Sequence, residues 1–234
     1  AAAKEEMRKI NERLTTLSTA YKNNALQSGA AYQKVITDES ELAGIPERAR
    51  NDYQAAAEEA GLPGKWLIKL SPPPVDVLDY SENRGLREEI FRAMKSVAAA
   101  APFDNRPVVL EIVKLRHRTA ELMGFSSYAA YVLDDRMSKT PQAVMELLET
   151  NLGVYKPAAE KFLQQVKDYA LKTDGVADFK PWDYNHYSRR LQEETYKVDV
   201  EQVRPYFDLE KVLEGLRIHA EKLFNITLTE SKGK

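Results

Sequence analysis

The sequence contains no cysteine and only three histidines among 234 residues. Without cysteine the chain has no disulfide, no thiolate ligand for zinc and no cysteine nucleophile. It also has no run of about 18 uncharged apolar residues, which a membrane-spanning helix needs. Residues 1–10 lack the apolar segment of a secretory signal. We therefore expect a soluble protein that acts in the cytoplasm and has no membrane partner.

The charges are balanced and scattered. Lysine and arginine number 34 against 36 aspartates and glutamates, a net charge of −2. A nucleic-acid binder normally carries a basic patch, and none is visible here, so we expect no nucleic-acid partner. With 43% hydrophobic and 30% charged residues, the chain is typical of a folded protein with a proper core.

Glycines and prolines separate a series of helical patterns, which predicts an all-α fold. We expect a multi-helix array with long, partly bent helices and at most a small β-ribbon. We treat residues 1–234 as one helical region with a weak internal break near 71–75, where three consecutive prolines lie. Helical spacing of apolar residues or capping signals mark residues 4–28, 47–60, 104–123, 127–133, 141–170, 184–196 and 209–223.

The helix that begins at Thr140-Pro141 has the clearest start signal, a hydroxyl cap followed by proline in the first turn. Pro157 lies inside this helix and displaces the bond to the carbonyl of Gly153, so we predict a bend there and not two helices. Its apolar residues recur three and four apart, which predicts one continuous stripe: Val144, Leu147, Leu148, Leu152, Tyr155, Ala159, Phe162, Leu163, Val166 and Ala170.

Two segments have strand-like composition. Residues 65–70 support either one strand of a two-stranded ribbon or a plain extended connector. Residues 226–229 alternate like a strand but have no partner, which suggests that the chain has been cut. Between them, Asp208 is expected to cap a last helix whose apolar residues face inward: Leu209, Val212, Leu213, Leu216, Ala220 and Leu223.

The three histidines do not form a metal site by spacing. A zinc peptidase motif of the HExxH type places two imidazoles four residues apart on one helix, with the glutamate activating water. The segments that begin at His117, His186 and His219 do not have this spacing. We interpret all three as structural or solvent-exposed residues and assign no metal ligand.

Adjacent acids are the next candidates for catalysis. They occur at 88–89, 134–135 and 193–194, as Glu88-Glu89, Asp134-Asp135 and Glu193-Glu194. Neighbours on a helix point about 100° apart, so these pairs do not converge as a general acid and base. Phosphate-binding glycine loops and G-x-S-x-G are absent as well. We therefore assign no catalytic residue and leave the substrate-binding residues unknown.

Aromatic residues gather in two places. One interpretation is that they line a groove that binds peptides or bases; the other, which we favour, is that they pack in the core. The first group is Tyr128 and Tyr131, and the second is Trp182, Tyr184, Tyr187, Tyr196, Tyr206 and Phe207.

Six colinear strings of this sequence resemble the thimet oligopeptidase family of zinc metallopeptidases. They cover nearly the whole chain, and they are DESELAGIPE (38–47), YSENRGLREEIFRA (80–93), DNRPVVLEIVKLRHRTAELMGFSSYAAY (104–131), MSKTPQAVMELL (137–148), KPWDYNHYSRRL (180–191) and RPYFDLEKVLEGL (204–216). Within the family, residues 64–68 look most like a bacterial peptidyl-dipeptidase, with oligopeptidase A the near rival.

The resemblance implies a helical, clam-shaped enzyme with a channel that admits short unfolded peptides. It places the zinc, the HExxH histidines and the catalytic glutamate C-terminal to residue 234, so no cofactor site is expected in this chain. The residues present would form channel wall, inactive alone, with the rest of the same polypeptide as partner. Bare apolar residues around Leu213, Leu216 and Leu223 would then favour self-association. The alternative is a free-standing helical module that binds peptides or proteins.

Overall fold

The computed structural model describes residues 2–198 and 200–229. Helices dominate this part of the chain, and its one sheet has two strands, which confirms the all-α class with a small ribbon. The chain divides into two compact units, residues 1–187 and 188–234, and each is described by itself. None of the described helices combines the length and apolar character that crossing a membrane requires.

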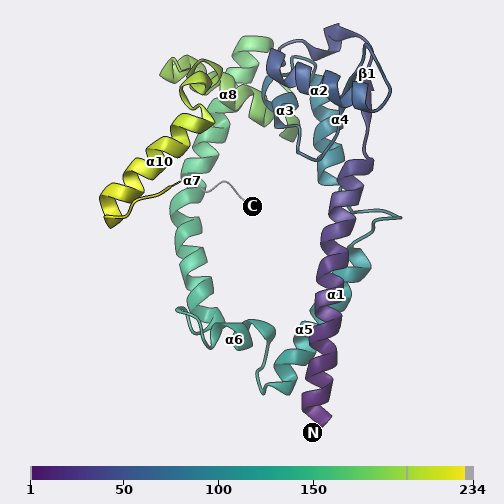
Figure 1. The fold of residues 1–234 in the computed structure, drawn as a ribbon, viewed down its shortest axis with the longest axis vertical. Coiled ribbons are helices and arrows are strands. Elements are labelled where there is room, and N and C mark those ends of the chain that lie inside the picture. The colour runs from purple at the N-terminus through teal and green to yellow at the C-terminus, as the bar shows by residue number, and fades with distance from the viewer. Residues whose placement is uncertain (1, 199, 230–234) are drawn as a thin grey trace. The chain divides into compact units, whose positions relative to one another are not determined.

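The first part of the first unit contains a long helix followed by short elements. In chain order these are α1 (Ala2–Ala31), β1 (Lys34–Ile36), a 3-10 turn (Glu39–Leu42), α2 (Glu47–Glu59), β2 (Trp66–Ile68), α3 (Val75–Tyr80) and α4 (Arg84–Lys95). The remaining elements are α5 (Arg106–Leu122), α6 (Tyr128–Leu133), α7 (Pro141–Asp174), a 3-10 turn (Pro181–Asp183), α8 (Tyr184–Tyr196), α9 (Val200–Val203), a 3-10 turn (Arg204–Tyr206) and α10 (Leu209–Phe224). Figure 1 shows the course of the chain.

The small sheet settles the alternative left open for residues 65–70. β2 pairs antiparallel with β1, with Val35 opposite Leu67. The segment is thus one strand of a ribbon and not a connector. Its partner was not predicted, because a three-residue strand is too short to show a period-2 pattern.

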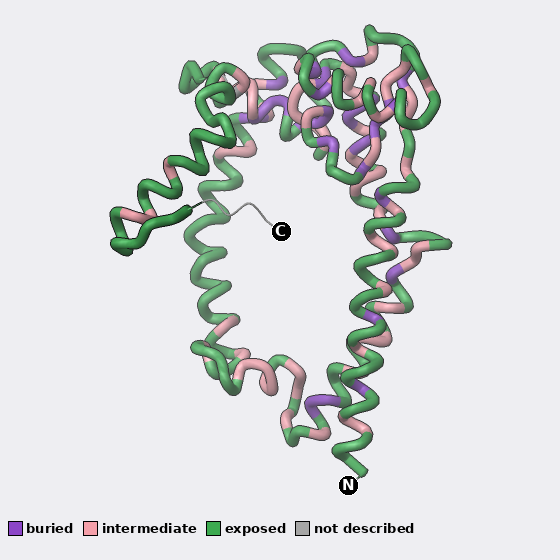
Figure 2. The backbone as a smooth tube through the Cα atoms, viewed as in Figure 1, coloured by how far each residue is buried: buried purple, intermediate pink, exposed green. Residues whose placement is uncertain are grey.

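The hydrophobic core of the first unit lies around this ribbon. Its members come from β1, β2, the first 3-10 turn, the bend that follows this turn, and helices α2 to α4, and Figure 2 colours many residues of this region as buried. They are Ile36, Leu42, Ile45, Ala49, Ile68, Val77, Leu78, Leu86 and Ile90. Helices α3 and α4, which the sequence analysis did not assign, supply four of these nine residues.

Helices α1 and α5 pack side by side (Figure 1). Ile10 and Leu17 of α1 and Ala120 of α5 are buried. Arg13 forms a two-pronged ion pair with Glu111, at 2.6 and 2.8 Å, that ties the two helices together at the surface.

The segment before α5 differs from the prediction in one contact. Residues 104–107 were expected to supply capping side chains for α5, but Asn105, which lies at the N-cap position, makes no cap hydrogen bond with its side chain. Its amide instead donates to the backbone oxygen of Tyr21 and accepts from Asn24, each at 2.9 Å. Tertiary contact with α1 therefore replaces the local cap, while Asp104 accepts from the backbone N–H of Arg106.

Helix α7 runs as one helix from Pro141 to Asp174 through Pro157, as predicted, and its ribbon curves along its length (Figure 1). The Thr140 hydroxyl accepts from the backbone N–H of Ala143 at 3.2 Å, which confirms the cap. At the other end Gly175 adopts φ 69°, a left-handed conformation that glycine adopts without strain.

The second unit corrects two predictions. Asp208 caps α10 through the backbone N–H groups of Glu210 and Lys211, as expected. However, no residue of α10 is buried, so its apolar residues do not face a core within the part of the chain that the structure describes. Residues 226–229 are described and form no strand; the backbone N–H of Leu228 instead donates to the Glu221 carboxylate at 3.1 Å.

Candidate functional site

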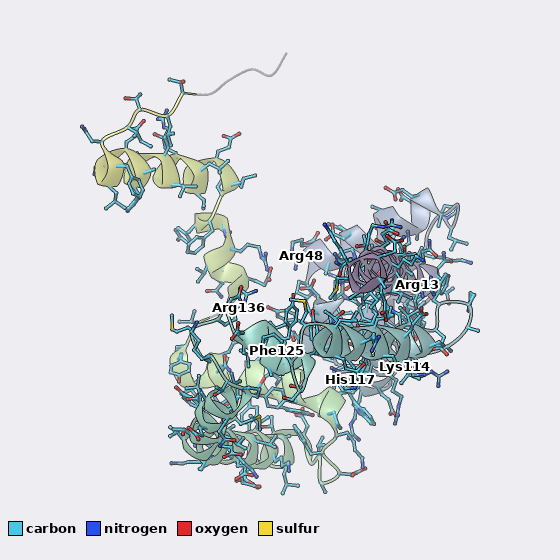
Figure 3. The ribbon with its side chains drawn as sticks, turned by 90° about the horizontal axis from the view of Figure 1, so that it is seen from below. Arg13, Arg48, Lys114, His117, Phe125 and Arg136 are labelled. Atoms are coloured by element: carbon cyan, nitrogen blue, oxygen red, sulfur yellow. The ribbon has the colours of Figure 1, made fainter. Side chains whose placement is uncertain are left out.

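The histidines lie on three different helices. His117 is exposed on α5, on the same side as Lys114 (Figure 3), and its Nε2 lies 3.3 Å from Glu121 Oε1. His219 is exposed on α10, with Nδ1 2.7 Å from the backbone oxygen of Gly215. His186 is buried at the start of α8 and meets the ring of Tyr187 edge-on at 5.0 Å.

The acidic pairs contact separate cations. Glu88 accepts from Arg92 at 2.8 Å, while its neighbour Glu89 accepts from Lys34 at 2.7 Å and from Tyr32 at 3.2 Å. Because the two carboxylates turn to different partners, they do not share a substrate position. The pairs at 134–135 and 193–194 are likewise engaged locally, with Asp135 near Arg136 and Glu193 bonded to Arg189.

Arg84, Arg87 and Asp183 of the first unit form a charged cluster around one buried carboxylate, which we call the Asp183 cluster; the Arg84 side chain remains 41% exposed. Arg84 binds the Asp183 carboxylate with both Nε and Nη2, at 2.9 and 2.7 Å. Arg87 adds a third bond at 3.1 Å, and the backbone N–H of Lys180 a fourth at 2.9 Å. Asp183 is 0% and Arg87 2% exposed, so this carboxylate has no contact with solvent.

The electrostatics of this cluster favour a fixed ion pair. Burial raises the pKa of the Asp183 carboxyl, but the hydrogen bonds from Arg84, the Lys180 backbone and Arg87 outweigh it, and the net pKa lies below the ordinary value. Two guanidinium groups on one carboxylate hold it ionised and fully occupied. The cluster thus joins α4 to the turn before α8 and offers no free acid or base for catalysis.

Sequence reasoning missed this cluster. Arg84 and Arg87 are three residues apart on α4, which places them on one face of the helix. Asp183 is separated from Arg87 by 96 residues. The spacing of the two arginines was the available signal, but it does not reveal which distant acid they bind.

The aromatic residues split between the two alternatives. Tyr187 is buried, and its hydroxyl donates to Asp174 at 3.0 Å, while Trp182 packs edge-on against Phe91. Tyr128 and Tyr131 are half-buried on α6. These four are packing residues, as favoured. Four others are exposed and were not expected to be so: Tyr184, Tyr196, Tyr206 and Phe207.

A hollow of about 600 Å³ lies between α1, residues 97–99 and α5. Its wall is mostly apolar and includes Tyr21, Ala25, Val109 and Leu110. The buried Asn105 amide at its edge is already bonded to α1. Such a hollow can accept an apolar side chain, but it brings no pair of free titratable groups together for chemistry.

Comparison with known proteins decides the family. Residues 77–234 match the sequence pattern of Peptidase family M3. The chain belongs to this family. The match confirms the resemblance to the thimet oligopeptidase family drawn from the six strings.

Relatives of this M3 chain carry peptidase names. Oligopeptidase A of Haemophilus influenzae is 38% identical over 229 residues, 96% of this chain and 34% of that protein. Oligopeptidase A of Escherichia coli is 37% identical over 228 residues, with 95% and 34% covered. Dipeptidyl carboxypeptidase of Escherichia coli is 30% identical over 236 residues, with 98% and 34% covered. The chain spans about a third of the length of these relatives.

Zinc, which the family resemblance implies, does not fit the residues at hand. A protein zinc site needs three or four nitrogen, oxygen or sulfur ligands from the chain within about 2.3 Å of the ion. Across residues 2–198 and 200–229 no three His, Cys, Asp or Glu side chains are grouped to hold a metal ion. We therefore assign no ligand and no reaction step through zinc to this part of the M3 chain.

Proposed function

We propose that this chain is the helical, wall-forming part of a zinc-dependent M3 peptidase that acts on short unfolded peptides. The observation that carries the proposal is the M3 match over residues 77–234, together with relatives named as peptidases of which the chain spans about a third. The wall part contributes shape, and the zinc and the groups that activate water belong to the remaining polypeptide. On this proposal the chain alone is not catalytic.

The contacts of the first unit support a rigid wall. The Asp183 cluster fixes the turn before α8 to α4, and the Arg13–Glu111 pair spans α1 and α5. A channel that excludes folded proteins by size depends on helices that hold their positions. Short unfolded peptides are the substrate class that passes such a wall, so they are the proposed partners. Action in the cytoplasm stays a prediction from composition.

The relatives bear on the type of cleavage. Identity is 38% and 37% with the two oligopeptidases A and 30% with the dipeptidyl carboxypeptidase. This order favours an oligopeptidase A-like activity. Release of C-terminal dipeptides, which residues 64–68 favour, is the second candidate because the dipeptidyl carboxypeptidase aligns with 98% of the chain.

The test is a hybrid enzyme in which this chain replaces the aligned region of Haemophilus influenzae oligopeptidase A. With zinc and a set of short peptides, we expect the hybrid to hydrolyse peptides and the 234-residue chain alone to leave them intact. Mass spectrometry of the products separates internal cleavage from dipeptide release. The unaltered relative is the positive control.

Two results would count against the proposal. Peptide hydrolysis by the isolated chain at an enzymatic rate would show that it carries its own catalytic groups. A folded hybrid without hydrolysis, combined with tight peptide binding by the isolated chain, would favour the free-standing binding module instead.

A further inference from the structure

Helix α7 carries one apolar stripe along its whole length. At about 100° of rotation per residue, ten of its apolar side chains fall within an arc of about 100°, whereas Leu147, which was predicted to belong to the stripe, lies about 60° outside it. The polar residues Glu146, Thr150 and Glu160 fall outside this arc. The stripe consists of Val144, Met145, Leu148, Leu152, Tyr155, Ala159, Phe162, Leu163, Val166 and Ala170.

The stripe is covered in one half of the helix and bare in the other. Val166 and Ala170 are 0% exposed, and Phe162 and Leu163 are half-buried. In contrast, Leu148 is 53%, Leu152 59% and Tyr155 68% exposed. The residue types do not change between the two halves. What changes is the presence of a packing partner among the described residues (Figure 2).

The position of Pro157 indicates on which side the bare half meets its partner. Pro157 and Gly153 fall about 140–180° from Leu148 around the helix, on the face opposite the stripe. Proline removes a hydrogen bond on its own side, and the helix opens there. Long helices curve with the convex side toward solvent and the concave side around a core. The stripe therefore lies on the side that a curved helix turns toward a core.

From these observations we propose that the bare half of the stripe, residues 145–155, is a permanent docking surface for a part of the M3 polypeptide outside these 234 residues. The inference rests on the proposed function, because it takes the chain to be one part of a longer peptidase. Two observations favour this occupant. The bare half continues a stripe that is already core at residues 162–170, and the relatives have about two thirds of their length outside the aligned region.

A peptide substrate fits this surface less well. A bound peptide needs partners for its backbone N–H and C=O groups. The stripe offers Met145, Leu148 and Leu152, which have no donor or acceptor suited to that task. The helix backbone is bonded within itself except at the Gly153 carbonyl, which lacks its bond because of Pro157 and lies on the opposite face. An apolar face whose own backbone is satisfied within its secondary structure is the matching partner.

The chain allows a direct test because it has no cysteine. Single cysteines are placed on the stripe as Leu152→Cys and on the opposite face as Thr150→Cys, both at exposed positions. Each variant is made in the isolated chain and in the hybrid with Haemophilus influenzae oligopeptidase A. The rate of maleimide labelling at the introduced cysteine is then read by peptide mass mapping.

In the isolated chain we expect both cysteines to react at similar rates. In the hybrid, we expect the labelling rate of Leu152→Cys to fall by at least about tenfold, because a packed side chain reacts only when its packing opens. The labelling rate of Thr150→Cys should stay unchanged. Equal rates for both variants in the hybrid would overturn the docking surface.

The outcome is separable from that of the proposed function, since hydrolysis and labelling are read independently. Hydrolysis with an unprotected Leu152→Cys leaves the peptidase proposal standing and removes the docking surface. A Leu152→Cys variant that is protected in a hybrid without hydrolysis supports the docking surface and counts against the peptidase proposal. If adding short peptide substrate to the isolated chain protects Leu152→Cys, the stripe is a substrate surface and the inference is wrong.

Discussion

The core around the β-ribbon and helix α10 contain similar apolar residues in opposite environments. Ile90 of α4 is 0% exposed, whereas Leu216 of α10 is 65% exposed. Both helices have apolar residues at helical spacing and both begin with a side-chain cap, at Asn83 and Asp208. The comparison teaches that spacing defines which face of a helix is apolar, while burial depends on what the rest of the chain places against that face.

The largest effect is expected at the Asp183 cluster. Asp183→Asn leaves Arg87 charged in a buried site without its partner, so the free energy of unfolding should fall by about 3–5 kcal/mol. Urea denaturation followed by circular dichroism measures the loss. Asp135→Asn is the matched control, because the Asp135 side chain is 82% exposed and its ion pair with Arg136 lies at the surface; its effect should stay below about 0.5 kcal/mol.

Acid denaturation gives a second readout of the same variant. The pKa of Asp183 is lowered in the folded protein, so the folded state favours its charged form. The stability that this group contributes is present above the unfolded pKa of about 3.9 and is lost as the pH falls through the lower folded value. Asp183→Asn should therefore flatten the acid limb of the stability curve below about pH 4. An unchanged acid limb would show that other carboxyls dominate.

The comparison between the core and α10 can be broken directly with one truncation in each. Ile90→Ala removes buried methyl groups and should cost about 2–5 kcal/mol of unfolding free energy. Leu216→Ala removes a similar group that is already in solvent, and should change stability by no more than about 0.5 kcal/mol. Similar losses for both variants would mean that α10 is packed in solution.

The smallest effect is expected at the cap of α10. Asp208→Ala removes the acceptor for two backbone N–H groups and should destabilise the first turn by about 1 kcal/mol. Hydrogen exchange of the amides of residues 209–212 should then become about fivefold faster. Asp208→Asn is the control, because asparagine caps equally well and should leave exchange nearly unchanged.

Helix ends were predictable because caps act locally. Thr140 and Asp208 each accept the backbone N–H bonds that were predicted for them, and Ser127 caps α6 in the same way. Asn105 lies at the N-cap position of α5, but its side chain bonds α1 across 84 residues of sequence, and no local pattern contains that information. Helix α3 was not assigned because it has six residues and follows three prolines, which leaves too few positions for a helical period.

For the candidate site, motif spacing bears only on residues that are close in sequence, and it did not predict their tertiary contacts. The spacing of His117, His186 and His219 argued against a shared metal, and the structure places them on three helices. The Asp183 cluster joins residues 96 and 99 positions apart. Periodicity and motif spacing describe only residues that are close in sequence, so the contacts of Asp183 with the two arginines are visible only in the folded chain.

The bare apolar residues of α10 and of the first half of α7 have a thermodynamic consequence for the isolated chain. Unfolding exposes little new apolar surface in these segments, because their side chains already contact water in the folded state. The heat-capacity increment of unfolding and the urea m-value both scale with newly exposed surface. Per residue, both quantities should therefore be smaller for this chain than for a fully packed protein of the same length.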